Sequence, residues 1–146
     1  MDEVRLKPIG VVRSRLTAPG QAPHQGPEAG SRAVIEIDPQ WARGLTGLDP
    51  GRDLWVICLF HLSPGPKLLA HPRGDQARPP TGVFNTRSPR RPCPLALTLV
   101  RLLAVEEGPG GPRLTVRGLE AVEGTPVLDI KPYVPGLDQP RKDDHA

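Results

Sequence analysis

The chain has 146 residues and a formal net charge of +3, and it contains 20 prolines and 16 glycines. With about one residue in four of these two types, long helices are disfavoured and short strands joined by turns are favoured. Leucine, isoleucine, valine and phenylalanine make up about another quarter, which is enough for a hydrophobic core and excludes a disordered protein.

Basic charge is concentrated in one loop-rich part of the chain. Residues 67–91 hold six basic side chains and a single acidic one, Asp75. Such a segment suits phosphate or carboxylate groups, although a solvated arginine-rich loop has the same composition. Composition alone leaves both interpretations open.

The predicted strands, in chain order, cover residues 8–14, 32–37, 53–61, 95–105, 113–118 and 126–133. Residues 53–61 and 95–105 are apolar on both faces, which predicts central strands buried from both sides. Asp38 as an N-cap, followed by Pro39, predicts a short helix that ends at Leu45. Residues 17–30 are expected to form a long loop, and residues 63–80 show no clear element.

These elements predict a mainly β fold: a small single-domain β-barrel with one or two short helices. The domain is expected to span residues 1–138, with a polar tail over residues 139–146. No G-x-G-x-x-G motif follows a strand, so the pattern is non-Rossmann, and neither a phosphate-binding P-loop nor a nucleophile elbow is present.

The sequence also bears on the cellular location of the protein and on whether it binds a metal. No apolar run approaches the ~18 residues of a membrane span, and the start lacks the apolar stretch of a signal peptide. We therefore expect a cytoplasmic protein that makes no membrane contact. Cys58 and Cys93 are predicted to be free thiols, and the histidines lack metal-ligand spacing, so no metal is expected.

One group of polar residues lies in the last predicted strand. Asp129, Lys131 and Tyr133 occupy positions i, i+2 and i+4, so they share one face of an extended strand. Pro126 and Pro132 place this segment at a sheet edge or rim, because proline cannot donate to a ladder. The pattern is typical either of a functional face or of a rim salt bridge beside a packed tyrosine.

A second group combines arginine with proline. Arg87, Arg90 and Arg91 lie among the prolines of residues 82–94. Proline restricts the backbone, so the guanidinium groups have less entropy to lose when they bind a carboxylate or phosphate. An arginine-rich turn between strands would show the same spacing.

Several motifs, in this order, resemble one known family. They are PIGVVRS at residues 8–14, Phe60-His61, GVFNTRSP at residues 82–89, RPCP at residues 91–94 and EGTPVLDIKPYVP at residues 123–135. This set resembles the TsaA-like family, whose characterised members are the TrmO tRNA methyltransferases. The resemblance covers about residues 7–138.

The resemblance implies a β-barrel methyltransferase that uses S-adenosyl-L-methionine and works as a homodimer. Its implied reaction is methylation of N6 of N6-threonylcarbamoyladenosine at position 37 of tRNA, in the anticodon loop. The residues it implies for cofactor binding are Gln25, Gly26, Pro27, His61, Arg87, Leu97, Gly118, Leu119 and Glu120. Those it implies for catalysis and substrate contact are Asp129, Lys131, Tyr133 and Arg91. We expect Asp129 or Tyr133 to lie nearest the acceptor nitrogen and Lys131 to orient Asp129 or a substrate carboxylate.

Three residues, His24, Cys93 and Ala96, depart from the family pattern and leave the acceptor open. The alternatives are a methyltransferase of the same fold that acts on another RNA or small-molecule acceptor, and a non-catalytic module that binds S-adenosyl-L-methionine or RNA. Phosphate contacts to tRNA are expected from Arg73, Arg78 and Arg90.

Overall fold

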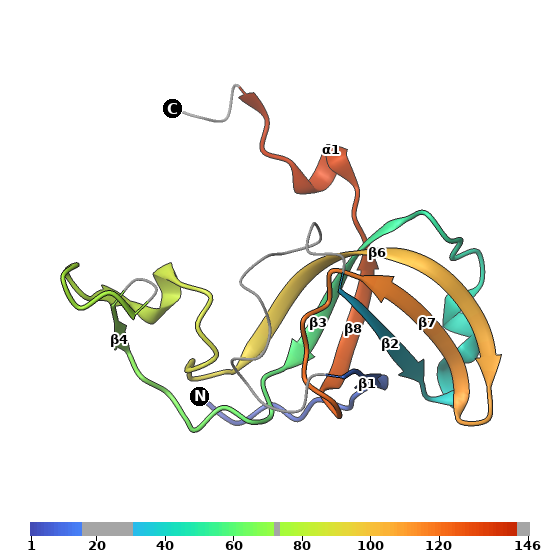
Figure 1. Ribbon diagram of the computed structural model, residues 1–146, viewed down its shortest axis with the longest axis horizontal. Coiled ribbons are helices and arrows are strands. Elements are labelled where there is room, and N and C mark those ends of the chain that lie inside the picture. The colour runs from blue at the N-terminus through green and yellow to red at the C-terminus, as the bar shows by residue number, and fades with distance from the viewer. Residues whose placement is uncertain (16–30, 72–73, 143–146) are drawn as a thin grey trace.

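The computed structural model describes residues 1–15, 31–71 and 74–142. Strands β1, β2, β7, β6, β3 and β8 close into one barrel in that order (Figure 1). Their bounds are Gly10–Arg13 for β1, Arg32–Ile37 for β2, Asp53–Leu59 for β3, Leu95–Gly108 for β6, Gly111–Arg117 for β7 and Pro126–Pro132 for β8. The prediction of a small, mainly β barrel is confirmed.

The helices are short, as the proline and glycine content predicts. Their bounds are Pro39–Leu45 for η2 and Val83–Asn85 for η4, both 3-10 helices, and Pro135–Asp138 for α1. Asp38 caps η2, since its Oδ1 accepts a hydrogen bond from the backbone N–H of Gln40 at 3.1 Å. In the described part of the chain, no helix is long and apolar enough to cross a membrane. The domain boundary at residue 138 stays a prediction.

The core fills the inside of the barrel. Alternate residues of the strands point inward, and many of them are almost completely buried. The largest of them are Val12, Ile35, Ile37, Leu54, Val56, Val100, Leu102, Leu114, Val116 and Val127. Cys58 belongs to the same cluster.

The prediction that β3 and β6 are buried from both sides is wrong. Only their inward-facing residues are buried, whereas Trp55 and Ile57 on the outer face are half-buried and Leu97 is 47% exposed. The physical reason is that a barrel has no second layer to cover its outer face. The apolar side chains on that face therefore form a surface, not a core.

Strand β8 pairs with both of its neighbours, but only briefly with β1. Pro126 lies opposite Val11 and Val127 opposite Gly10, while residues 129–132 pair with β3 alone in the described structure. The predicted edge position is therefore confirmed for the second half of the strand.

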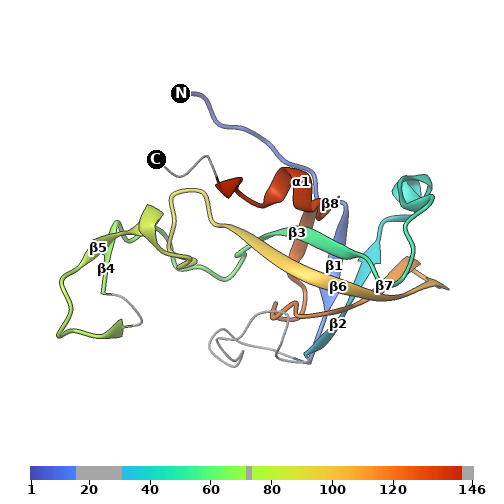
Figure 2. The same cartoon turned by 90° about the horizontal axis from the view of Figure 1, so that it is seen from above.

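The described part of residues 62–94 forms an arm that projects from one side of the barrel (Figures 1 and 2). It contains β4 (Leu69–Ala70) and β5 (Thr81–Gly82), which pair with each other, and η4. The sequence predicted no element in residues 63–80. Strand β4 forms there because it finds its partner, β5, beyond that segment.

Candidate active site

The outer face of β6, β3 and β8 brings residues of three strands into register. Leu97, Ile57 and Asp129 lie opposite one another across the strands. A second row, one pleat away, contains Leu99, Trp55 and Lys131. Residues opposite one another on antiparallel strands share a face, so the two charged groups adjoin a half-exposed apolar surface.

Asp129 is held by two neighbours of its own strand. Its Oδ2 lies 3.1 Å from Nζ of Lys131, and its Oδ1 accepts a hydrogen bond from the backbone N–H of Ile130 at 2.9 Å. Both charged side chains remain about half exposed. The carboxylate is therefore oriented but still accessible from outside the barrel.

Tyr133 follows directly after β8 and extends the same face. Its backbone N–H donates to the carbonyl of Asp53 at 2.9 Å. Its ring meets the ring of Trp55 edge to face, with the centroids 5.9 Å apart. The structure thus brings Asp129, Lys131 and Tyr133 together on one face, as the spacing predicted.

The two arginines of the arm make different contacts. Arg87 Nη1 donates to the carbonyl of Leu97 at 3.2 Å, so this residue adjoins the outer face. Arg91 Nη1 donates to the carbonyls of Thr86 at 2.7 Å and Ser88 at 3.3 Å, and its guanidinium lies over the Phe84 ring. Within the described chain, Arg91 therefore contacts the arm and not Asp129.

The turn after β7 contains three of the residues that the resemblance implies for the cofactor. Gly118 adopts φ +98° and donates to the carbonyl of Ser31 at 2.8 Å. Leu119 is 3% exposed and packs in the core, so only its backbone can meet a ligand. Glu120 is half-buried and its Oε1 is enclosed by protein.

For the remaining residues that the resemblance singles out, the structure gives only their position and exposure. His61 follows β3 and is exposed. Gln25, Gly26 and Pro27 lie outside the described residues, as does His24. Cys93 is an exposed free thiol, whereas Ala96 lies opposite the buried Cys58.

Among the described residues, no group of three or more histidine, cysteine, aspartate or glutamate side chains could hold a metal ion.

Sequence reasoning missed Trp55 and Ile57 as part of this face. The signal is present, because residues 53–61 are apolar at both odd and even positions. Such a pattern predicts burial on both sides in a layered fold, but in a single-layer barrel it marks an apolar outer surface as well as a core.

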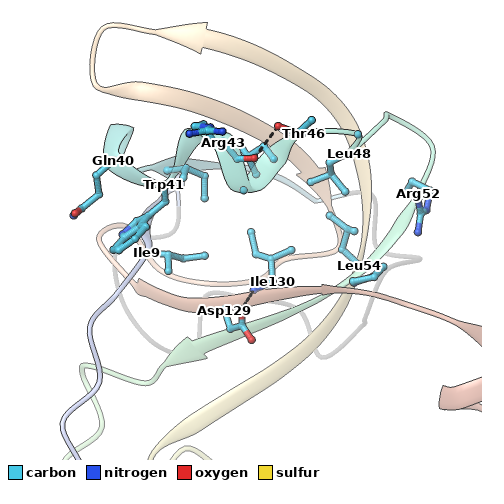
Figure 3. A pocket seen from close by; sticks show the side chains of 15 residues that line it. Ile9, Gln40, Trp41, Arg43, Thr46, Leu48, Arg52, Leu54, Asp129 and Ile130 are labelled. Atoms are coloured by element: carbon cyan, nitrogen blue, oxygen red, sulfur yellow. Dashed lines mark hydrogen bonds between the residues drawn. The ribbon is translucent and has the colours of Figure 1, made fainter.

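A cavity of about 480 Å³ lies elsewhere, at the barrel end beneath η2. Ile9, Leu54 and Ile130 point into it and Trp41 stands at its mouth, while Asp129 lies on the other side of the β8 ribbon (Figure 3). The turn at Gly118 and the end of β3 lie at the opposite end of the barrel. Of the residues that the resemblance implies and the structure describes, Asp129 alone touches this cavity, and none of those implied for cofactor binding does.

Fold and site together define a small non-Rossmann β-barrel with an oriented carboxylate on an apolar outer face. Residues 11–139 match the family described as the tRNA-methyltransferase O N-terminal domain. The chain belongs to this family.

Individual proteins agree with this assignment. The chain is 40% identical over 136 residues to a probable S-adenosyl-L-methionine-binding protein of Methanothermobacter thermautotrophicus, covering 93% of this chain and 94% of the relative. It is 36% identical to the human tRNA (adenine(37)-N6)-methyltransferase, covering 92% of this chain and 31% of that protein. The crystal structure of TrmO from Pseudomonas aeruginosa superposes with a TM-score of 0.73 at 32% identity, covering 97% of this chain and 60% of that one. The chain thus spans less than two thirds of the solved structure.

Proposed function

We propose that this protein transfers a methyl group from S-adenosyl-L-methionine to N6 of N6-threonylcarbamoyladenosine at position 37 of tRNA. The observation that carries the proposal is the carboxylate of Asp129, oriented by Lys131 beside an apolar surface. The names of the relatives support the cofactor and the target base, since one is an S-adenosyl-L-methionine-binding protein and another a tRNA (adenine(37)-N6)-methyltransferase.

The residues around the outer face fit this cofactor chemically. The adenine and the methylene chain need apolar walls, which Leu97 and its neighbours on β6 and β3 provide. Arg87 uses Nη1 on the carbonyl of Leu97, and its other N–H groups suit a carboxylate. Glu120, in the turn after β7, carries a carboxylate, and carboxylates accept hydrogen bonds from ribose hydroxyls. The charge of Lys131 is balanced by Asp129, which limits its repulsion of a sulfonium.

The cofactor supplies an electrophilic methyl group, and the protein supplies position and a proton acceptor. As the new carbon–nitrogen bond forms, the bond between the methyl carbon and the sulfonium sulfur would break and S-adenosylhomocysteine would leave. The acceptor nitrogen loses its proton in the same reaction, and a carboxylate within hydrogen-bond reach can accept that proton. We assign this role to Asp129, whose carboxylate is oriented by Lys131. Tyr133, held against Trp55, limits where a base can lie on the face. Such positioning contributes a large part of the acceleration of a bimolecular displacement.

The proposal includes a homodimer, in which the arm of one copy reaches the outer face of the other. The arm exposes a set of large apolar side chains that the barrel of the same copy does not cover: Leu62, Leu68, Leu69 and Phe84. A dimer would also bring Arg91 of a second copy toward Asp129. Light scattering of the wild type and of a Leu68→Ser, Leu69→Ser variant tests this, with a monomeric wild type as the contrary result.

The proposed reaction is tested by mass spectrometry of tRNA nucleosides from a strain that lacks the gene. We expect N6-methylated threonylcarbamoyladenosine to disappear and the unmethylated form to accumulate. Wild-type protein should restore the methyl group and Asp129→Asn should not. Unchanged nucleosides would contradict the proposed acceptor and favour another RNA or a small molecule.

A second candidate is a binding module without turnover, which the names of several relatives favour. A module would gain thermal stability from the cofactor, but it would release no S-adenosylhomocysteine with any acceptor.

The cytoplasmic location expected from the sequence remains a prediction.

A further inference from the structure

Three arginines form a row across the outer face of β2, β7 and β6, which lie side by side in the barrel (Figure 1). Arg32 lies directly opposite Arg117, and Arg117 lies directly opposite Arg101. Ala33 and Val116, their chain neighbours, are buried in the core, so the arginine side chains point outward. We call Arg32, Arg117 and Arg101 the arginine row.

The arginine row places like charges directly opposite one another on neighbouring antiparallel strands. Such an arrangement destabilises the pairing of the two strands. Farther along β2 the charges are complementary, because Oε1 of Glu36 lies 3.5 Å from Nε of Arg13 on β1 and 3.2 Å from Nη1 of Arg113 on β7. Within the row only Arg101 has such a partner among the described residues, Asp53, at 2.9 Å. The described residues contain no hydrogen bond or ion pair from the guanidinium of Arg32 or Arg117. An external anion would supply the missing countercharge.

The arm, where the sequence predicted phosphate contacts, is less free to bind. Arg90 Nε donates to the carbonyl of Gly65 at 3.1 Å, and Arg78 lies 3.6 Å from Asp75. Arg73 lies outside the described residues. Counting contacts with the described residues alone, the guanidinium groups of Arg32 and Arg117 have more donors free for a ligand than those of Arg90 and Arg78.

The row leads toward the candidate active site. Arg101 pairs with Asp53, and the carbonyl of Asp53 accepts the backbone N–H of Tyr133. With neighbouring strands ~4.8 Å apart, the row spans roughly 10 Å. A single carboxylate or phosphate would not need a row of that length. Successive phosphates along one nucleic-acid strand would match it.

We propose that the arginine row binds the sugar–phosphate backbone of the RNA whose target base reaches Asp129. This inference rests on the proposed function, because it takes tRNA as the substrate. Guanidinium–phosphate contacts of this kind position a nucleic acid without reading its sequence. The row is thus a positioning surface and has no part in the chemical step.

The test compares Arg32→Gln, Arg117→Gln with a control of equal charge change at exposed arginines outside the row, Arg5→Gln, Arg43→Gln. Binding of unmodified tRNA is measured by fluorescence anisotropy over a series of salt concentrations, without cofactor. We expect the row variant to bind about tenfold more weakly and to lower the salt slope by about 0.7 for each phosphate that the protein no longer neutralises. The control should stay within about twofold of the wild type. Removing a like-charge pair should leave the melting temperature equal or higher, so misfolding cannot account for weaker binding.

Equal tRNA affinity of the row variant and the control would overturn the inference, and so would a wild type that binds no tRNA. If the wild type binds tRNA through the row but releases no S-adenosylhomocysteine with any tRNA, the proposed reaction fails while the binding surface stands. With an active wild type, we expect the row variant to raise KM for tRNA and to leave kcat and cofactor affinity unchanged.

Discussion

Nζ of Lys131 and Oδ2 of Asp129 lie 3.1 Å apart on the outer face of the barrel, two residues apart on β8. An exposed ion pair of this kind contributes only ~0–1 kcal/mol to stability. The ion pair orients the Asp129 carboxylate, because Lys131 and the backbone N–H of Ile130 together fix both of its oxygens.

The first prediction concerns catalysis. Asp129→Asn keeps the size of the side chain but removes the carboxylate that we propose as the proton acceptor, so we expect kcat to fall by ~10²–10⁴-fold. Cofactor affinity, measured by calorimetry, should change little. Tyr133→Phe is the matched comparison on the same face. If both variants keep wild-type turnover with saturating cofactor, neither residue accepts the proton.

The second prediction concerns the thiols. Cys58 lies in the core, and burial raises the pKa of its thiol to about 12, whereas Cys93 is exposed. Since the thiolate is the reactive form, one thiol per chain should react with a chromogenic disulfide near pH 8 in the native protein. The second should react only after unfolding. Cys93→Ser should abolish the native reaction, and a remaining fast thiol would show that Cys58 is accessible.

The third prediction concerns the hairpin between β6 and β7. Gly111 adopts φ +120°, and a Cβ there would collide with the carbonyl of Ile37 and the ring of Pro39. We expect Gly111→Ala to cost ~2–3 kcal/mol, which corresponds to roughly 5–10 °C in melting temperature. Gly110→Ala is the control, because the nearest atom to its Cβ is a side-chain oxygen of Glu36 at 3.4 Å. Equal melting temperatures of the two variants would contradict the constraint at Gly111.

The fourth prediction concerns acid stability. The hydrogen bond from Arg13, reinforced by the backbone N–H of Ser14, lowers the pKa of the Glu123 carboxyl. The unfolded chain then binds this proton more readily than the folded one, so the stabilisation is present above the unfolded pKa and is lost as pH falls through the folded pKa. Glu123→Gln should therefore lower the melting temperature near pH 6 and lose that difference toward pH 3. Parallel curves of wild type and variant would contradict this.

Much of the fold could be predicted from local pattern. The alternation of apolar and polar residues identifies β2 and β7, and Asp38 with Pro39 marks the start of η2. Helix α1 was missed, because Pro135–Asp138 is a single turn with no apolar periodicity. Strand β4 was missed because two residues carry no periodicity of their own, and only their pairing with β5 makes them a strand.

The site was predictable to the extent that it lies on one strand. Asp129, Lys131 and Tyr133 share a face because side chains alternate along β8. The outer apolar surface was not predictable. A strand that is apolar on both faces can have its second face covered by another layer of the protein, by a ligand or by a partner, and the sequence pattern is the same in each case. The arginine row was also missed, since Arg32, Arg117 and Arg101 are far apart in sequence and meet only through strand register.

The most direct measurement is release of S-adenosylhomocysteine by the purified protein with tRNA that carries threonylcarbamoyladenosine. We predict multiple turnovers with this tRNA, none with the same tRNA lacking the threonylcarbamoyl group, and a loss of at least ~10²-fold for Asp129→Asn. A protein that binds the cofactor but releases no S-adenosylhomocysteine with the modified tRNA would contradict the proposal that its outer face is a site of methyl transfer to this base.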